Sequence, residues 1–534
     1  MSLIKLESGS VKVTAKELQP LLQKAGLELS ESLVDEFSIL LTGFEAAIDS
    51  LPDDRLVEPR PDLEKYPRID IHVPEDNESG AWATKVTARC TQPRSTLLKG
   101  RTVALKDNIA LAGVRCTNGT AMVEWVPEID ATVATRVMDA GGIILGKSSC
   151  ENACMEGISC TSVTGAVHNP YAKGYSAGGS SSGSGRLVAT GAVDLAIGCD
   201  QGGSIRIPAA SCGIVGLKPT WGLVPYTGIL SLDPTLDHAG PMARTVRDCA
   251  LLLEVIAGPD EWDDRQPRIQ LGGYQVEYVR EIDQVTSLPK NAMLRGMKVG
   301  ILSEGFKIPG HDENVSACVL SAAKKLNELG ATVSTVSVPK HLEAMAAWTA
   351  FVPALSPQGS LLGEKHGRKE LYLTDRCELV GDKLTQAQFD ALGPGASYMY
   401  LAYLWVRERY GPKLHARCMN LLKAVGDAFD QALKDVDVLI TPTLPNLPAK
   451  LPEGGYGPGP LKLMKMSTGI LANACAMNST GHPAISLPVG FSTTTDDPNV
   501  KLPVGMQIIG RKFSDIDCLK VAAAWENAFD WKTL

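Results

Sequence analysis

Two short loops rich in glycine and serine contain the residues of this sequence that are best suited to nucleophilic chemistry. The first loop covers residues 178–185 and the second covers residues 198–208. The apolar run between them, residues 187–197, is typical of a buried helix and strand, so each loop ends a core element and neither is a flexible linker. Glycines beside Ser204 let backbone N–H groups converge on a small negative centre, which the oxygen of a tetrahedral intermediate requires.

A phosphate-binding motif competes with this interpretation. Residues 141–148, Gly-Gly-Ile-Ile-Leu-Gly-Lys-Ser, match the pattern G-x-x-x-x-G-K-S letter for letter. A phosphate loop follows a strand and opens a helix. Here residues 130–140 predict a helix before the motif, and the apolar residues 143–145 predict a strand inside it. We therefore expect structural glycines at this motif, and a nucleotide-binding protein is the weaker hypothesis.

The first loop also matches the nucleophile elbow of α/β-hydrolases. Residues 179–183 have the pattern G-x-S-x-G, which needs a buried strand that delivers the serine to a sharp turn. The preceding residues 168–175 are instead polar and rich in turn formers. A triad would also need a histidine and an acid, for which His238, beside Asp237, and the distant His311 are the candidates. The elbow stays open as a secondary hypothesis.

Six segments of the chain together resemble the amidase-signature family. They are the serines and glycines of the first loop and the segments 106–108, 200–208, 216–220, 478–484 and 502–507. The resemblance covers residues 100–258 and continues in the two later segments, 478–484 and 502–507. It therefore spans most of the predicted catalytic domain. The form Asp-Gln-Gly-Gly in the second loop, with three serines in the first and a helical N-terminal segment, is similar to bacterial nitrile-pathway amidases of broad substrate range.

This resemblance implies roles for individual residues. The catalytic relay is implied to consist of a terminal base, a bridging serine on a cis peptide bond and a nucleophile, which are Lys106, Ser180 and Ser204. The oxyanion hole and substrate-binding residues are implied to be Gln201, Gly202 and Gly203. Supporting residues of the loops are Ser181, Asp200 and Arg206, and the pocket wall is expected to include Cys154 and Met155.

A lysine can replace histidine as proton acceptor only if its neutral amine is populated. Burial disfavours the ammonium form and so lowers the pKa of a lysine. Lys106 directly follows the apolar residues 102–105, which predict a strand that ends inside the core. We therefore expect Lys106 to be buried with a lowered pKa, and Ser180 to bridge its amine to the hydroxyl of Ser204.

The expected reaction is hydrolysis of a small-molecule carboxamide. Ser204 attacks the carbonyl carbon, the leaving amine receives a proton through Ser180, and water then releases a carboxylic acid from the acyl-enzyme. The resemblance implies no cofactor and no metal. A rival within the same fold is the amidase-like component of a tRNA-dependent amidotransferase, which works with a partner protein. Aliphatic and aromatic amides both remain open as substrates.

From residue 97 onward, short apolar runs alternate with amphipathic stretches, which is the pattern of an α/β protein. This pattern predicts a mixed sheet covered by helices. The clearest predicted strands are 102–105, 143–145, 299–302, 332–338, 436–440 and 502–510. The clearest predicted helices are 130–140, 246–256, 315–329, 398–410 and 414–433.

A helical N-terminal domain is predicted at residues 1–75, where apolar residues recur at steps of three and four and Ser30 is a plausible N-cap. Residues 76–534 are expected to form the catalytic domain. Within it, residues 340–465 are more helical and less regularly patterned, so we interpret them as an insertion that faces the substrate. The N-terminal helices and the resemblance suggest a homodimer.

Charge and composition argue against other partners. Asp and Glu number 60 against 52 Lys and Arg, for a net charge of -8, and such an acidic field repels nucleic-acid phosphates. The N-terminus lacks the basic and apolar regions of a signal peptide, and no apolar run is long enough to span a membrane. We therefore expect a cytoplasmic protein that binds neither nucleic acid nor membrane.

The 13 cysteines are odd in number and scattered, as expected for free thiols in a reducing compartment. Three of them cluster, at Cys150, Cys154 and Cys160. Since no histidine lies at ligand spacing beside them, we expect packed thiols and not a metal site there.

Overall fold

The structure is a computed structural model of the 534-residue chain. It describes residues 12–77, 79–266, 277–364, 367–453 and 459–534. The chain divides into two compact units, Met1–Pro59 and Arg60–Leu534. In the part of the chain that is described, no helix has both the length and the apolar character needed to cross a membrane.

From residue 12 onward, where the structure describes it, the smaller unit contains two helices and a short 3-10 turn, which are α1 (Ala15–Ala25), α2 (Glu31–Asp49) and η1 (Asp54–Val57). Ser30 caps α2, because its Oγ accepts a hydrogen bond from Leu33 N at 3.4 Å. This confirms the predicted N-cap. The two helices share a small apolar cluster formed around Leu18, Leu22 and Val34.

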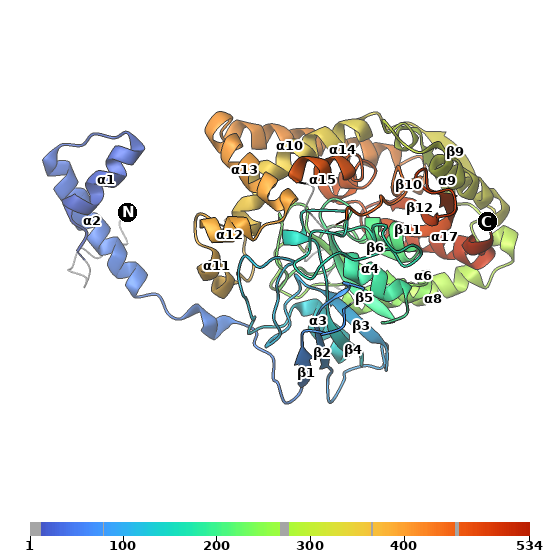
Figure 1. The fold of residues 1–534 in the computed structure, drawn as a ribbon, viewed down its shortest axis with the longest axis horizontal. Coiled ribbons are helices and arrows are strands. Elements are labelled where there is room, and N and C mark those ends of the chain that lie inside the picture. The colour runs from blue at the N-terminus through green and yellow to red at the C-terminus, as the bar shows by residue number, and fades with distance from the viewer. Residues whose placement is uncertain (1–11, 78, 267–276, 365–366, 454–458) are drawn as a thin grey trace. The chain divides into compact units, whose positions relative to one another are not determined.

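The larger unit is built on one twelve-stranded mixed sheet, as predicted, with the order β1-β2-β4-β3-β5-β7-β6-β11-β12-β10-β8-β9 (Figure 1). Its strands are β1 (Arg68–His72), β2 (Trp82–Ala88), β3 (Thr102–Lys106), β4 (Ile143–Ser148), β5 (Leu195–Asp200), β6 (Val215–Lys218), β7 (His238–Ala243), β8 (Lys298–Leu302), β9 (Thr332–Val336), β10 (Val438–Pro442), β11 (Ala484–Thr493) and β12 (Lys501–Gly510). β3 pairs in parallel with β4 and β5, and β8 pairs in parallel with β9 and β10.

The helices of the described residues surround the sheet, and several of them pack mainly against other helices and not against strands. They are α3 (Thr132–Asp139), α4 (Ser182–Ala189), α5 (Arg206–Cys212), α6 (Val246–Ile256), α8 (Tyr278–Thr286), α9 (Glu313–Lys325), α10 (Lys340–Ser360), α11 (Thr374–Val380), α12 (Gln386–Asp390), α13 (Pro394–Arg409), α14 (Pro412–Ala432), α15 (Pro460–Met466), α16 (Cys475–Thr480) and α17 (Asp515–Ala528). Short 3-10 turns lie at η2 (Asn152–Cys154), η3 (Lys290–Ala292), η4 (Ser303–Phe306), η5 (Leu326–Leu329) and η6 (Trp531–Thr533).

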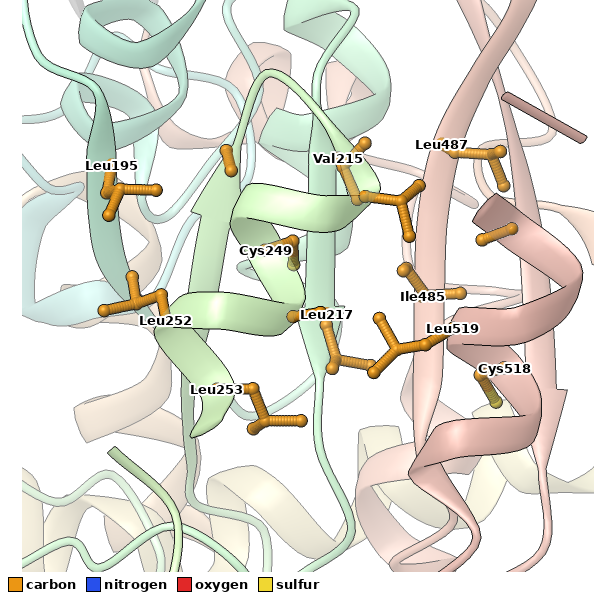
Figure 2. Close-up of a cluster of buried hydrophobic side chains, with 14 of the residues drawn as sticks. Leu195, Val215, Leu217, Cys249, Leu252, Leu253, Ile485, Leu487, Cys518 and Leu519 are labelled. Atoms are coloured by element: carbon orange, nitrogen blue, oxygen red, sulfur yellow. The ribbon is translucent and has the colours of Figure 1, made fainter. Parts of the chain in front are cut away.

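The core lies on both faces of the sheet, because side chains alternate along each strand. In β5, Leu195 and Ile197 belong to the largest buried cluster, whereas Ala196 belongs to a second cluster formed with α4 and α5. Figure 2 shows the first of these clusters, in which α6 and α17 pack their buried side chains against β5, β6 and β11. The face with α4 and α5 is therefore the one next to the two glycine and serine loops.

The predicted strands and helices from residue 97 onward are all present, with ends that differ by a few residues. The segment predicted as helical at residues 1–75 is not helical throughout, because Arg68–His72 form strand β1 of the sheet, and the chain divides after Pro59. The helix predicted at 246–256 coincides with α6, and the one predicted at 315–329 is α9 followed by η5. Residues 446–453 form a loop without helix or strand. All thirteen cysteines are free, and all but Cys318 and Cys377 are buried.

Candidate active site

Lys106 enters the site from the end of β3. The carboxyl ends of parallel strands are where sheets of this type present functional residues, and β3 lies between its two parallel neighbours, β4 and β5. Lys106 is fully buried. Its Nζ donates hydrogen bonds to Ser180 Oγ at 2.7 Å and to the carbonyl oxygen of Cys199, in β5, at 3.3 Å.

Ser180 lies in the first loop, directly ahead of α4. The Gly179–Ser180 peptide bond is cis. Gly179 has no room for a side chain, because a Cβ atom there would lie 2.8 Å from Glu151 Cγ. Glu151 N donates in turn to the carbonyl of Ser180 at 3.1 Å. The loop is therefore packed tightly against the chain around residue 151.

Ser181 joins the first loop to the second. Its N–H donates to the carbonyl of Ser204 at 3.2 Å, and its hydroxyl donates to the carbonyl of Cys199 at 3.3 Å. Turns, bends and isolated bridges occupy residues 171–181. The strand that a nucleophile elbow needs therefore does not precede Ser181.

The two candidate histidines for an elbow triad, His238 and His311, do not have the hydrogen bonds of a triad histidine. In such a triad, the histidine donates from Nδ1 to a carboxylate. Here Nδ1 of His238 is bonded to the carbonyl of Leu236 at 2.7 Å, and Nδ1 of His311 is bonded to the carbonyl of Ile308 at 2.9 Å. Burial also holds the pKa of His238 well below its ordinary value. Neither candidate histidine is therefore bonded to a carboxylate through Nδ1 as the elbow hypothesis requires.

Ser204 lies between the end of β5 and the start of α5. It is buried but lines a cavity. Of the two links in the predicted relay, the structure has the one between Lys106 and Ser180. Among the described residues, no hydrogen bond joins the hydroxyls of Ser180 and Ser204, although Ser181 ties the main chains of the two loops together.

A buried ion pair holds the second loop. Arg206, fully buried, donates from Nε and Nη2 to the two carboxylate oxygens of Asp200 at 3.0 and 2.9 Å. Burial raises the pKa of Asp200, but the charge and hydrogen bonds of Arg206, together with hydrogen bonds from Asn478 and Ile205, outweigh burial and hold this pKa well below its ordinary value. Asp200 also accepts hydrogen bonds from the main-chain N–H groups of Gly203 at 2.7 Å and Ile205 at 3.1 Å.

The remaining donors of Arg206 reach distant parts of the chain. They bond to Gln507 Oε1 at 2.7 Å in β12, to Asn478 Oδ1 at 2.7 Å in α16, and to the carbonyl of Ala474 at 2.9 Å. Asn478 donates back to Asp200 Oδ1 at 2.8 Å. Sequence reasoning assigned no role to Asn478 or Gln507, and the only available signal was that both lie in the later segments of the family resemblance.

Gly202 and Gly203 are glycines for steric reasons. A Cβ at Gly202 would lie 2.8 Å from Trp348 Cζ2, and one at Gly203 would lie 2.7 Å from Ile207 Cδ1. Trp348, in α10, also donates from Nε1 to the carbonyl of Gln201 at 3.1 Å. The side-chain amide of Gln201 donates to the hydroxyl of Tyr226 at 2.8 Å.

A cavity of about 330 Å³ opens beside Ser204. Cys154, Met155, Gln201 and Gly202 line it, and much of the remaining wall is apolar, including Leu232, Met345, Trp348, Val352, Met399 and Ile470. Several of these wall residues come from α10 and α13, which lie in the segment predicted as an insertion at 340–465. Glu156 and Tyr398 also line the cavity and were not selected from the sequence.

The thiol groups near Lys106 change its electrostatics. Burial lowers the pKa of Lys106, but negative charge on the neighbouring thiols, Cys154 first among them, outweighs burial and raises this pKa. The hydrogen bond with Cys150 and, beyond it, the charge of Lys106 lower the pKa of Cys154 to about 6. The expected lowering of the Lys106 pKa is therefore wrong for the resting site, because burial was the only effect considered.

The phosphate-loop motif does not form a phosphate-binding loop. Its residues Ile143–Ser148 are strand β4, preceded by helix α3. Lys147 is fully buried and its Nζ donates to Asp107 Oδ1 at 3.1 Å. The glycines of the motif are structural, since a Cβ at Gly142 would lie 2.8 Å from Val137 Cγ1.

One group of acidic residues has the spacing of metal ligands within the described ranges. It consists of Asp263, Asp264 and Glu370. Arg368 lies within ion-pair distance of all three carboxylates, and Arg265 pairs with Asp263. These arginines already supply the positive charge, so the group is explained as an ion-pair network.

Comparison with known proteins agrees with this architecture. A protein-family model described as Amidase matches residues 67–519. An enantioselective amidase from Rhodococcus rhodochrous is 38% identical over 466 residues, which make up 85% of this chain and 84% of that protein. The chain belongs to the amidase-signature family.

Solved structures similar to this amidase have the same fold. A glutamyl-tRNA(Gln) amidotransferase component from Thermotoga maritima has a TM-score of 0.66 and 28% identity, covering 84% of this chain and 88% of that chain. A bacterial aryl acylamidase of the amidase-signature family has a TM-score of 0.68 and 25% identity, covering 82% of this chain and 84% of that one. This amidase is thus a hydrolase that acts on amides.

Removing the cation of the Asp200–Arg206 pair tests its structural role. In Arg206→Met, Asp200 stays buried without a counter-charge, so we expect the free energy of unfolding to fall by about 3–5 kcal/mol. The matched control is Arg247→Met. The ion pair between Arg247 and Asp283 is half exposed, so its loss should lower the free energy of unfolding by less than about 1 kcal/mol. Chemical denaturation of both variants measures the difference, and equal midpoints would contradict the assignment.

Proposed function

We propose that this amidase hydrolyses carboxamides to a carboxylic acid and ammonia or an amine through an acyl-enzyme on Ser204. The observation that supports this best is the 2.7 Å hydrogen bond from a fully buried Lys106 to Ser180, next to the loop that holds Ser204 at the cavity. A buried amine bonded to a serine is the arrangement expected of a base that acts through a bridging hydroxyl.

In the proposed first step, Ser204 Oγ attacks the amide carbon while its proton passes to Ser180, and the proton of Ser180 passes to neutral Lys106. The carbon–nitrogen bond then breaks, and the departing nitrogen takes a proton back from the same relay. In the second step water attacks the ester carbon and loses its proton through Ser180 to Lys106. The bond between the acyl carbon and Ser204 Oγ then breaks, Ser204 Oγ takes the proton back from the relay, and the acid leaves. For these transfers the hydroxyl of Ser180 must turn toward Ser204 when substrate binds.

The second loop provides the proposed oxyanion donors. Because Asp200 accepts the N–H of Gly203, the donors that we assign to the carbonyl oxygen are the N–H groups of Gln201 and Gly202, with Gly203 shaping the turn. Each such donor contributes roughly 3 kcal/mol to lowering the barrier. The side-chain oxygen of Gln201, buried at the cavity without a partner among the described residues, suits the N–H of the substrate amide.

The apolar cavity favours an amidase over an amidotransferase component. Glutamine carries an α-carboxylate that needs a positive partner when it is bound. Among the described residues that line the cavity there is no lysine, arginine or histidine. If the chain were part of an amidotransferase, glutamine hydrolysis would appear on adding a partner protein, and simple amides would be poor substrates.

The relay is tested with four variants assayed for ammonia release from a primary amide. We expect Ser204→Ala and Ser180→Ala to abolish turnover, and Lys106→Met to lower kcat/KM by about 10²–10⁴-fold. Ser182→Ala is the matched control, since Ser182 lies in the same loop and its buried Oγ has no hydrogen-bond partner in the described structure. Wild-type turnover in Ser204→Ala would remove the nucleophile assignment.

The thiol beside the base leads to a prediction on pH dependence. A base works only when it is deprotonated, and the negative charge of Cys154 raises the pKa of Lys106. In Cys154→Ala the pKa of Lys106 therefore falls, so the acidic limb of the pH profile of kcat/KM should move to lower pH. Cys249→Ala, which removes a buried thiol in the cluster of Figure 2, is the control. An unmoved limb in Cys154→Ala would contradict the coupling.

A homodimer formed through the N-terminal unit is the second part of the proposal. One face of α2 exposes a row of large apolar side chains at helical spacing, namely Leu33, Phe37, Leu40, Phe44 and Ile48. A contiguous apolar face of this kind is costly in water and is typical of an interface. A second copy of the same helix, packing its apolar face against this one, would cover it symmetrically.

Light scattering on the purified chain tests the dimer. We expect a dimeric mass for the wild type and a monomeric mass for the double variant Phe37→Glu/Phe44→Glu, because two charges on the face oppose its burial. Leu288→Glu is the control, since it places the same charge on an exposed leucine outside α2. A monomeric wild type would refute the proposal.

A further inference from the structure

Glu156 is a buried acid in the wall of the cavity. Its side chain is only 6% exposed, and its Oε1 is bonded to no group among the described residues. It lines the same cavity as Ser204 and Gln201. A buried carboxylate oxygen without a partner is costly, and the relay proposed above makes no use of this acid.

The surroundings of Glu156 add negative charge, and no lysine, arginine or histidine is among the described residues that line its cavity. The buried carboxyl of Glu151 lies close enough to act on it, and burial together with that charge raises the pKa of Glu156 to about 8. Oε2 of Glu151 is occupied, because it accepts hydrogen bonds from Cys160 N and from the hydroxyl and N–H of Thr161. Oε1 of Glu151 also lacks a hydrogen-bond partner, and no hydrogen bond joins the carboxyls of Glu151 and Glu156 within the described residues.

The chain leaves room for this carboxyl. Gly395, in the first turn of α13, packs directly against it, and a Cβ at residue 395 would overlap Glu156 Oε1. The N-terminal turn of a helix favours a negative charge nearby, so the ionised form of Glu156 has some support. What the site lacks is a cation to pair with it.

The other wall residues suit a cation with a short carbon chain. Two aromatic residues, Trp348 and Tyr398, line the cavity, and most of the remaining wall is apolar. Aromatic faces attract ammonium groups, and an apolar wall accepts the methylene groups that carry one. No lysine, arginine or histidine is among the described lining residues, so nothing in the wall would repel such a group.

We propose that Glu156 is a specificity-determining residue that selects amides whose acyl portion carries a basic amine. The ammonium group of the substrate would pair with the carboxylate of Glu156 while the amide carbonyl lies at Ser204. This inference rests on the proposed amidase function and adds the chemical class of its substrate. The competing explanation is that Glu156 only stabilises the start of α13.

The test compares two series of primary amides of equal length, ω-amino amides from 3-aminopropanamide to 6-aminohexanamide and the alkanamides in which a methyl group replaces the amine. Assays at pH 8 keep both the carboxylate and the ammonium well populated. We expect the wild type to prefer the amino amide at one chain length, and Glu156→Gln to lower this ratio of kcat/KM values at least tenfold, mainly through KM.

Two controls separate recognition from structural support. Glu151→Gln removes the neighbouring carboxyl, which is not part of the cavity wall, and should keep the amine preference. For the wild type itself, pentylamine should inhibit competitively and more strongly than pentan-1-ol, a measurement that holds even if Glu156→Gln folds poorly. A purely structural role would lower turnover of both amide series equally and leave their ratio unchanged.

The outcomes also distinguish this inference from the proposed function. If neither series is hydrolysed, the proposed function fails. If alkanamides are hydrolysed but no amino amide is preferred, or if the preference survives in Glu156→Gln, the amidase function stands and the assignment of Glu156 is wrong.

Discussion

The contact between Asp200 and Arg206 determines the shape of the active site. Both side chains are fully buried, and Arg206 reaches Asp200, α16 and β12 at once, so one guanidinium joins three segments that lie far apart in the sequence. Asp200 in turn accepts the N–H groups of Gly203 and Ile205. Because a buried charge must keep its partners, the loop that bears Ser204 has little freedom to change its conformation.

Two opposing effects determine the pKa of Lys106, the proposed base of the active site. Removal of water favours the neutral amine of Lys106, whereas negative charge on the nearby thiols favours the ammonium form and has the larger effect at rest. The charge of Lys106 in turn lowers the pKa of Cys154, so each group favours the charged form of the other. A substrate that alters the surroundings of either group acts on both.

Local patterns made much of this fold predictable. Strands β3 and β4 and helix α6 have apolar residues at clear strand or helix spacing, and the sequence places Lys106 at the end of a buried strand. The convergence of Lys106 and Ser180 followed only from the family resemblance, since 74 residues separate them. The contacts of Arg206 with Asn478 and Gln507 span 272 and 301 residues, and no local pattern encodes them.

Other features could not be read from the sequence because they depend on packing. Glu156 follows Met155 in a segment with no periodic pattern, and its importance comes from the cavity and from Gly395, which the chain reaches 239 residues later. The upward shift in the pKa of Lys106 likewise depends on which cysteines the fold brings near it. Burial alone was predictable, and the identity of the neighbours was not.

The groups proposed to react and the groups that surround the substrate belong to different parts of the architecture. Lys106, Ser180 and Ser204 stand at the ends of sheet strands and the loops beside them, whereas α10 and α13 furnish much of the wall. Exchange of side chains on those two helices can therefore alter which molecule is accepted without disturbing the ion pair beneath the nucleophile. Such a division lets the descendants of one ancestor diverge in what they consume while the bond-breaking apparatus is inherited intact.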